Sequence, residues 1–225
     1  MPSPTVWRSA AGVACTLAAL LAPTASAHAA AGPGDHVVLP VRDALAALPL
    51  AREDRTGYER ARFRHWIDAD KDGCSTRAEV LKAEALLAPE QGARCALTGG
   101  RWYSPYDDRY FDAAGGLDID HLVPLAEAWD SGASAWTSLE RQAYANDLDD
   151  ARALIAVSAA SNRSKADQDP ATWMPPSAGY TCTYATDWIT IKTRWNLAID
   201  PAEQTTLTSV LAHCPNTPVD VTLAH

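Results

Sequence analysis

The chain has 225 residues, of which 21% are charged, and its formal net charge is −9 at pH 7. A chain of this length can bury the core of one domain. The excess of acidic residues excludes binding of nucleic acid through overall charge, so any contact with a polyanion needs a local basic patch and a bound cation.

The N-terminus is typical of a secretory signal peptide, which we place at residues 1–29. Arg8 precedes an apolar run at 10–22, and an A-x-A site of small residues follows shortly after. The run is too short to span a membrane comfortably, which disfavours an uncleaved anchor. We therefore expect a secreted protein, cleaved after Ala27 or Ala29, with no membrane attachment in the mature form. Loss of the one charged residue of the signal leaves a formal charge of about −10.

Hydrophobic periodicity and turn residues divide the rest of the chain into short helices and strands. We expect a leader and a first helix at 30–55, and a single domain at 56–225. Pro124 is expected to open a helix, because proline suits the first helical turn. The predicted elements are a flexible leader at 30–40, helices at 41–50, 56–68 and 78–88, strand and loop at 92–110, a strand at 117–123, helices at 124–129 and 139–150, a strand at 153–157, a helix beginning at Ser161 and Asn162, and helices at 185–197 and 201–212.

Four cysteines follow the signal peptide, and an even number in an exported chain suggests disulfides. They are Cys74, Cys95, Cys182 and Cys214. Three pairings are possible in principle, and we favour the nearest-neighbour pairing because it closes two modest loops. A zinc site is the less favoured alternative, because there is no C-x-x-C pair and the four cysteines are scattered.

The segment 117–125 carries the densest chemical signal in the chain. Alternation along a strand places Ile119 on one face and Asp118 and Asp120 on the other, and His121 follows where the strand yields to a turn. A carboxylate beside a histidine can hold a metal ion next to a proton acceptor. Hydrolysis of a phosphodiester needs this pair, a cation for the developing charge and a base for water.

A second polar group lies downstream, at the expected start of a helix. The amide oxygen of Asn162 suits a hard cation such as Mg²⁺. Arg163 and Lys165 are the candidate substrate-binding residues, because both can meet phosphate.

Together, Asp-Ile-Asp-His-Leu-Val-Pro-Leu at 118–125 and Asn-Arg-Ser-Lys at 162–165 resemble the motifs of HNH (ββα-metal) endonucleases. The chain is similar in particular to secreted actinobacterial proteins related to the C-terminal domain of GmrSD-type restriction endonucleases, from about Trp66 to Trp195. The fold that we expect is α+β, with a small ββα-metal core inside a mainly helical, disulfide-bonded domain.

The resemblance implies a role for each residue of the motif. His121 matches the general base, Asp120 the first metal ligand and Asn162 a second metal ligand, which makes these three the catalytic residues. Asp118 stands where related domains often keep an acid that supports the ligands.

The residue that orients the base departs from the family pattern. Ala153 stands where family spacing places an asparagine, and Asn146 is our candidate to replace it from the preceding helix. His121 must be neutral to take a proton from water, so we expect activity to fall below the ordinary histidine pKa of about 6.5.

An independent motif at residues 68–79 matches the calcium loop of an EF-hand. Acidic residues fall at loop positions one, three and five, a glycine at six and a glutamate at twelve. A second such loop is absent from the sequence, so we expect a lone, structural Ca²⁺ site; an acidic turn without an ion is the alternative. The loop residues are Asp68, Asp70, Asp72, Cys74, Thr76 and Glu79.

These patterns predict a secreted, monomeric endonuclease that hydrolyses the phosphodiester bonds of nucleic acid, DNA foremost. We expect Mg²⁺ as the catalytic ion, with Mn²⁺ or Zn²⁺ as alternatives. The competing function is a non-enzymatic, secreted calcium-binding module in which His121 is structural. A zinc hydrolase of another type ranks last, because the chain has no H-E-x-x-H or other paired-histidine spacing.

Overall fold

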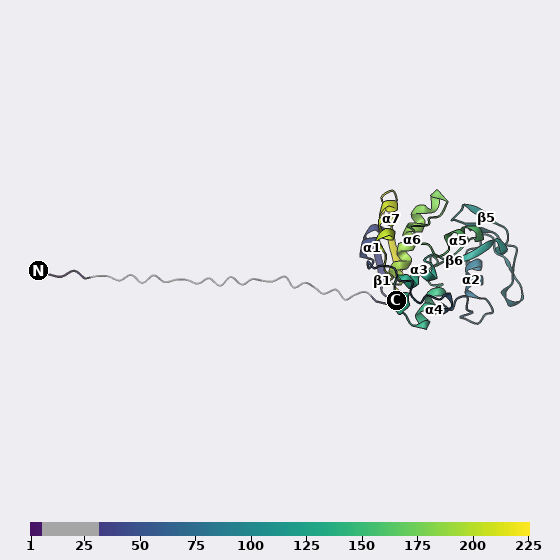
Figure 1. Ribbon diagram of the computed structural model, residues 1–225, viewed down its shortest axis with the longest axis horizontal. Coiled ribbons are helices and arrows are strands. Elements are labelled where there is room, and N and C mark those ends of the chain that lie inside the picture. The colour runs from purple at the N-terminus through teal and green to yellow at the C-terminus, as the bar shows by residue number, and fades with distance from the viewer. Residues whose placement is uncertain (6–31) are drawn as a thin grey trace. The chain divides into compact units, whose positions relative to one another are not determined.

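The computed structural model describes residues 1–5 and 32–225 (Figure 1). Apart from its first five residues, the predicted signal peptide therefore lies outside the described residues. Residues 32–225 belong to one compact unit, and the description below concerns this unit alone. Among the described residues, no helix is both long enough and apolar enough to cross a membrane.

A two-stranded antiparallel sheet followed directly by a helix lies near the middle of the unit. Strand β6 (Leu117–His121) pairs with β7 (Leu154–Ser158), and the register runs from Leu117 opposite Ser158 to His121 opposite Leu154. Helix α5 (Ala159–Lys165) begins at the end of β7, because the side chain of Ser158 accepts a hydrogen bond from the backbone of Ser161 and caps the first turn. This arrangement places the end of β6 beside α5.

Two short helices fill the connection between β6 and β7. Helix α3 (Leu125–Asp130) follows Pro124 and is buried along its whole length. Helix α4 (Ser138–Ala145) begins at a capping box, in which Thr137 and Glu140 satisfy each other's backbone N–H groups. The 3₁₀ turn η4 (Ala133–Ala135) lies between the two helices.

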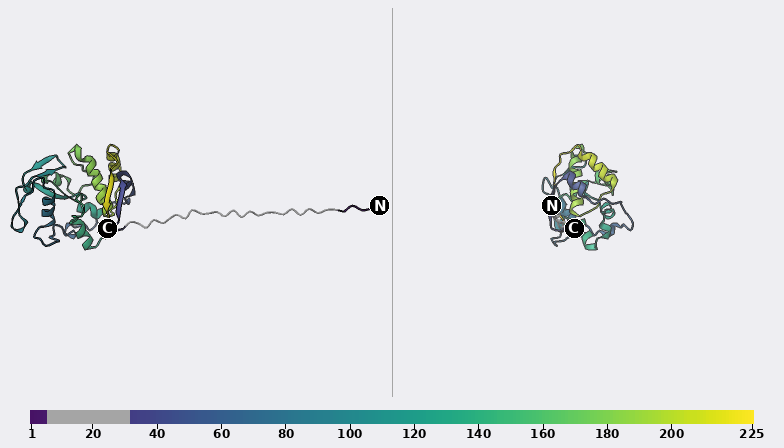
Figure 2. Two further views of the ribbon diagram at one scale, coloured as in Figure 1. Left: turned by 180° about the vertical axis from the view of Figure 1, so that it is seen from behind. Right: turned by 90° about the vertical axis from the view of Figure 1, so that its left-hand side faces the viewer.

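The C-terminal helices and the N-terminal segment form one end of the unit (Figures 1 and 2). Asp200 and Glu203 form a capping box at the start of α7, and proline occupies its first position. Strands β1 and β8 pair antiparallel, although about 180 residues separate them. The elements here are β1 (His36–Pro40), α1 (Val41–Ala47), η5 (Ala178–Tyr180), α6 (Thr181–Arg194), α7 (Pro201–Leu211) and β8 (Pro218–Thr222).

The opposite end is built from one helix and two small hairpins, with α2 and β5 visible there in Figure 1. Trp102 at the start of β4 is fully buried, and its indole N–H donates to the carbonyl of Leu81 in α2. The elements are α2 (Thr76–Ala83), β2 (Glu90–Gln91), η2 (Ala93–Cys95), β3 (Leu97–Thr98), β4 (Trp102–Ser104), β5 (Arg109–Phe111) and η3 (Ala114–Gly116).

Two disulfides close the predicted loops. Cys74 is bonded to Cys95, and Cys182 to Cys214, which is the nearest-neighbour pairing. The first ties the segment before α2 to the β2–β3 hairpin, and the second ties the start of α6 to the residues after α7. Because a disulfide sulfur is no longer a thiolate, these cysteines are not available as zinc ligands.

The structure confirms an α+β fold, but two expectations about its elements are wrong. Residues 56–68 form only the 3₁₀ turn η1 (Arg60–Arg62), because Gly57 and Trp66 have positive φ angles of 73° and 60° that a right-handed helix excludes. Residues 36–40 of the expected leader form β1. A mainly helical domain is not confirmed, since four two-stranded sheets are distributed among the helices.

Candidate active site

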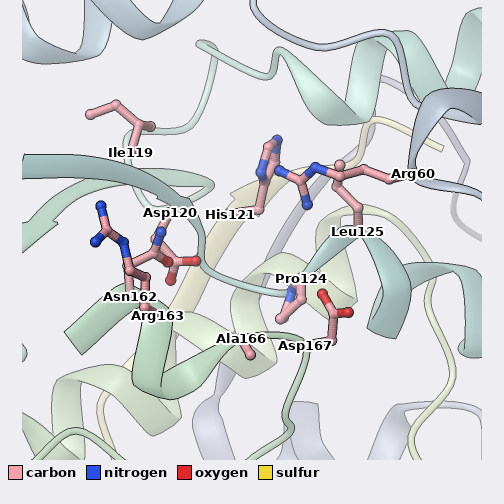
Figure 3. Close-up of a pocket in the computed structure, with 10 residues that line it drawn as sticks. All are labelled: Arg60, Ile119, Asp120, His121, Pro124, Leu125, Asn162, Arg163, Ala166 and Asp167. Carbon is pink, nitrogen blue, oxygen red and sulfur yellow. The ribbon is translucent and has the colours of Figure 1, made fainter. Parts of the chain in front are cut away.

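A cavity of about 340 Å³ opens at the end of β6, beside α5 (Figure 3). The three predicted catalytic residues, Asp120, His121 and Asn162, line it together with Arg163, a predicted substrate-binding residue. The structure thus brings residues about 40 positions apart in the sequence to one pocket, because β6 and β7 are adjacent and α5 continues from β7. Arg60 and Asp167 line the same cavity.

The imidazole of His121 is buried, and a backbone carbonyl fixes its orientation. Its Nε2 atom lies 3.0 Å from the carbonyl oxygen of Ala145, at the end of α4. A carbonyl can only accept, so in the neutral ring Nε2 carries the proton and Nδ1 keeps its lone pair. No hydrogen bond to Nδ1 is formed within the described residues, which leaves that atom available as a proton acceptor.

The environment of His121 strongly favours its neutral form. Burial, together with the nearby charges of Arg60 and His65, lowers its pKa to about 3, and the hydrogen bond to Ala145 opposes the shift. The expected loss of activity near pH 6.5 stays a prediction, but the low pKa favours a neutral imidazole well below that pH in the free protein.

Asp120 is buried and held by two donors on one oxygen. The hydroxyl of Tyr106 and the ammonium of Lys165 both donate to Oδ2, each at 2.6 Å. Burial raises the pKa of Asp120 and lowers that of Lys165, and the ion pair between the two opposes both shifts. None of the described residues donates to Oδ1, so one carboxylate oxygen remains free at the cavity.

Lys165 does not lie where a substrate would meet it. Its side chain is completely buried, and the ammonium also donates to the carbonyl of His121 at 3.0 Å. This position contradicts the prediction that Lys165 contacts a phosphate. The side chain is inaccessible to solvent, and its ammonium donates to Asp120 and to His121 within the protein. Lys165 instead holds the end of β6, through the side chain of Asp120 and the backbone of His121.

The other predicted residues of α5 and β6 meet around Asp118. The Nδ2 group of Asn162 donates to Oδ2 of Asp118 at 3.3 Å, and Nε of Arg163 lies 3.8 Å from the same oxygen. With Nδ2 turned to Asp118, Oδ1 of Asn162 is left without a donor in the described part of the chain. Arg163 has a side chain that is 77% exposed, so it can reach a ligand at the cavity mouth.

Asn146 does not contact His121, but it holds the backbone next to Ala145, whose carbonyl binds His121. Its side chain accepts from the backbone of Ile67 and from the hydroxyl of Thr76, and donates to the carbonyls of Arg64 and Gln142. The residue before it provides the carbonyl that binds His121. Its predicted role in orienting the base remains a prediction, with an indirect route through the backbone.

Arg60 is a residue of the cavity that the sequence motifs did not reveal. It comes from η1, and its side chain extends toward the His121 ring (Figure 3). The sequence does contain a signal for a basic patch, namely five arginines within residues 52–64. An acidic chain that binds a polyanion needs such a local cluster. Without the fold, the site to which this cluster belongs could not be assigned.

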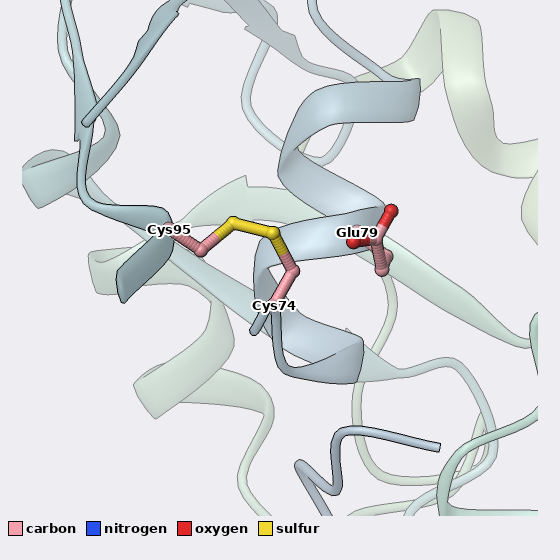
Figure 4. A group of neighbouring side chains, drawn as sticks. All are labelled: Cys74, Glu79 and Cys95. Carbon is pink, nitrogen blue, oxygen red and sulfur yellow. A yellow bond between two sulfur atoms is a disulfide. The ribbon is translucent and has the colours of Figure 1, made fainter. Parts of the chain in front are cut away.

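The calcium-loop residues are only partly assembled. Oxygens of Asp68, Asp70 and Asp72 lie within 4.8 Å of one another, and Gly73 turns with a φ of 93°. Glu79 lies instead beside the Cys74–Cys95 disulfide (Figure 4). Lys82 donates to it at 3.2 Å. The hydroxyl of Thr76 is used by Ile67 and Asn146. Three of the predicted ligands are therefore grouped and Glu79 is apart from them.

Comparisons with known proteins assign the chain to a family. The chain belongs to the family of the C-terminal domain of GmrSD restriction endonucleases, whose pattern it matches over residues 83–210. An uncharacterized secreted protein of the fungus Arthroderma benhamiae is 45% identical over 170 residues, which cover 76% of this chain and 81% of that protein. This relative is fungal, so the expected actinobacterial affinity is not confirmed. No solved structure matches.

Proposed function

We propose that the protein is a secreted, metal-dependent endonuclease of the HNH type that cleaves the phosphodiester bonds of nucleic acid, with DNA as the main substrate. Membership of a restriction-endonuclease family supports this proposal. The observation that carries it is the state of His121: a carbonyl holds Nε2, Nδ1 is free, and the ring lines a cavity with Asp120 and Asn162.

The oxygen atoms at this cavity fit a hard divalent cation. Asp120 and Asn162 each use one polar atom inside the protein and keep one oxygen without a donor in residues 32–225. One carboxylate and one amide oxygen suit Mg²⁺ or Mn²⁺, which keep several water molecules and take further ligands from substrate phosphate. Zn²⁺ is less suitable, because it prefers nitrogen and sulfur ligands. A cation held here would stabilise negative charge on the phosphate and on the leaving oxygen.

The side chains of the protein supply the remaining chemistry. Nδ1 of His121 accepts a proton from the attacking water, while Nε2–H stays bonded to Ala145 and keeps the ring in place. The low pKa reflects burial and the charge of Arg60. A bound phosphate diester places a negative charge in the cavity and raises the proton affinity of the ring.

Arginines around the cavity resolve the conflict between an acidic protein and a polyanionic substrate. Arg60 and Arg163 line the cavity itself, and the exposed Arg62 and Arg64 belong to the same segment as Arg60. Guanidinium groups bind phosphate oxygens in pairs. We therefore assign the phosphate backbone to Arg60 and Arg163, and withdraw Lys165 from that role.

Further parts of the proposal concern the organisation of the chain. We propose that β6, β7 and α5 correspond to the ββα-metal core, that residues 1–29 are a signal peptide and that the mature protein is a monomer. The description of the fungal relative as secreted supports export. The nuclease domain includes β1 and α1 as well as residues 56–225, because these elements belong to the same compact unit.

A structural Ca²⁺ ion in the loop 68–79 is a second candidate property. The grouping of three aspartate oxygens favours it. In the alternative function, a calcium-binding module without enzymatic activity, this loop would be the functional site and His121 would be structural.

Plasmid cleavage by the secreted, disulfide-bonded protein tests the proposal. We expect nicking with Mg²⁺ or Mn²⁺, no nicking with EDTA, and at least a 100-fold loss of rate in His121→Ala. His213→Ala is the matched control, because His213 is exposed and outside the cavity. Equal activity of wild type and His121→Ala, or inactivity of wild type with every metal, would reject the nuclease and favour the calcium-binding module.

A further inference from the structure

Five carboxylates from four separate segments converge outside the nuclease cavity. Oxygens of Glu53, Glu127 and Asp130 lie within 4.8 Å of one another, and so do oxygens of Glu53, Asp169 and Asp200. Glu127 and Asp130 belong to α3, Asp169 follows α5, and Asp200 is the N-cap of α7. Glu53 is common to both groups and thus lies between them. We call these five residues the acidic cluster.

The two acids of α3 are each anchored by a cation through one oxygen. Arg55 donates to Oδ2 of Asp130 at 2.6 Å. Lys192 donates to Oε1 of Glu127 at 2.8 Å, and the hydroxyl of Ser131 donates to the same atom at 2.7 Å. These donors fix the orientation of both carboxylates, and none of them uses the second oxygen.

The same one-sided anchoring recurs in the other segments. Oδ1 of Asp169 accepts from the backbone and the hydroxyl of Thr172. Oδ1 of Asp200 accepts from the first backbone N–H groups of α7. Four of the five carboxylates are therefore held rigidly by one oxygen while the other stays without a donor from the described residues.

One of these free oxygens is buried, which points to a missing ligand. Asp130 is only 7% exposed, and its Oδ1 atom is inaccessible to solvent and has no hydrogen-bond partner among residues 1–5 and 32–225. A buried, charged oxygen without a partner is strongly unfavourable, and native structures rarely retain one. A cation within the acidic cluster would satisfy it.

The charge balance leads to the same conclusion. The acidic cluster has two cationic partners, Arg55 and Lys192, and Lys192 is shared with a further buried acid, Glu203. If all five carboxylates are ionised, three negative charges are left without a cationic partner in the described residues. Burial and the charge of Glu127 raise the pKa of Glu53 to about 7, as expected for an acid crowded by other carboxylates.

We propose that the acidic cluster binds one Ca²⁺ ion through oxygens of Glu53, Glu127 and Asp130, while Asp169 and Asp200 add negative charge beside Glu53. Ca²⁺ takes six to eight oxygen ligands in flexible geometry, whereas Mg²⁺ rarely occupies an all-protein cage. The cluster contains no histidine or cysteine, so its donor set does not suit Zn²⁺. The ion would join the loop at Glu53 to α3, and Glu53 also lies beside the acids of the segment after α5 and of the start of α7.

The site has a structural consequence for the nuclease cavity. Helix α3 begins directly after Pro124, so the ion would fix the element that follows β6, and Asp169, four residues after Lys165, lies beside Glu53 in the same cluster. Arg55 also lies 3.9 Å from Asp167, which lines the cavity. The proposal does not depend on the nuclease function, because it concerns ion binding and stability alone.

Calorimetric titration with CaCl₂ of the secreted, disulfide-bonded protein, stripped with EDTA and desalted, tests the site. The variants are Glu53→Gln and Asp169→Asn, both isosteric; Glu53 is exposed, so its replacement leaves the core intact. Asp70→Asn in the loop 68–79 is the matched control for the other candidate calcium site. Circular dichroism shows whether each variant is folded.

We expect Glu53→Gln and Asp169→Asn each to weaken one class of bound Ca²⁺ by at least about tenfold, because Glu53 is a ligand, Asp169 adds charge beside it, and the charge at a site sets calcium affinity. The rise in Tm with 1 mM CaCl₂ should shrink in both variants and persist in Asp70→Asn. Unchanged stoichiometry and affinity in Glu53→Gln and Asp169→Asn, or Ca²⁺ binding that is lost entirely in Asp70→Asn, would overturn the proposal. The readout involves no nucleic acid, so its failure is distinct from failure of the nuclease proposal.

Discussion

Replacing Lys165 by methionine should destabilise the folded protein by about 3 kcal/mol at pH 8. The ammonium of Lys165 is completely buried and donates to Asp120 and to the carbonyl of His121. Removing one member of a buried ion pair costs about 3–5 kcal/mol, because the other charge stays buried without compensation. We take the lower value because Tyr106 still donates to Asp120 in the variant. For a chain of this size the loss corresponds to a decrease of about 6–12 °C in Tm.

The loss should become smaller as the pH falls. Burial raises the pKa of Asp120, and Lys165 provides the main opposing influence, so the folded variant should protonate Asp120 well above its ordinary pKa of about 3.9. A group with a raised pKa in the folded state favours folding below its unfolded pKa and opposes it above its folded pKa. The penalty is therefore full at pH 8 and decreases toward pH 4.

Urea denaturation followed by tryptophan fluorescence, with the disulfides intact, measures the loss at pH 8 and at pH 5. Lys82→Met is the matched control; Lys82 is partly exposed and paired with Glu79, so its loss should cost less than about 1 kcal/mol. Adding Asp120→Asn to Lys165→Met should recover part of the stability. A loss below about 1 kcal/mol at pH 8, or an equal loss at both pH values, would refute the assigned role of the ion pair.

Three further predictions concern the cavity and its support. In EDTA, His121 of the unfolded chain takes a proton near pH 6.5, whereas His121 of the folded protein takes one only near pH 3. Between pH 6 and pH 4, the contribution of His121 to the free energy of unfolding should therefore fall by about 1.4 kcal/mol per pH unit. His121→Asn should show a shallower pH dependence than wild type, and parallel stability curves would contradict the low pKa. Arg60→Gln should weaken metal-free binding of labelled DNA, measured by fluorescence anisotropy, by about 3–10-fold. It should also lower the slope of the log binding constant against log salt concentration by about one, the share of one phosphate contact. Arg109 is exposed and outside the cavity, so Arg109→Gln should change neither quantity. Asn146→Ala should cost about 2 kcal/mol in urea denaturation, because it removes the side-chain partners of the Ile67 N–H and the Arg64 carbonyl; a loss under about 0.5 kcal/mol would show that this amide does not fix the backbone near His121.

Local patterns were enough to predict the elements that carry the candidate site. Alternation through Ile119 gave β6, and Pro124 gave the start of the helix that follows. The predicted strand at 153–157 corresponds closely to β7 (Leu154–Ser158). Because these three elements are close in sequence and have regular polar and apolar spacing, their signals did not depend on distant contacts.

Features that depend on distant contacts were not accessible to such patterns. The sequence predicts a flexible leader where β1 lies, because the partner strand β8 is about 180 residues away. It predicts that Lys165 meets phosphate, because nothing in the local sequence indicates that Tyr106 and Asp120 enclose this side chain. The acidic cluster draws on four segments from residue 53 to residue 200, each of which looks like ordinary surface in the sequence.

The support of the candidate base extends beyond the region shared with the family. The family match begins at residue 83, yet the side chain of Asn146 binds Arg64, Ile67 and Thr76, all of which precede it. The carbonyl adjacent to Asn146 in the chain holds Nε2 of His121. Ile67 and Thr76 flank the aspartates of the loop 68–79, so the loop and the base share one backbone support. Any ion that tightens this loop would therefore act on His121 through the position of residues 145–146, and not through its charge.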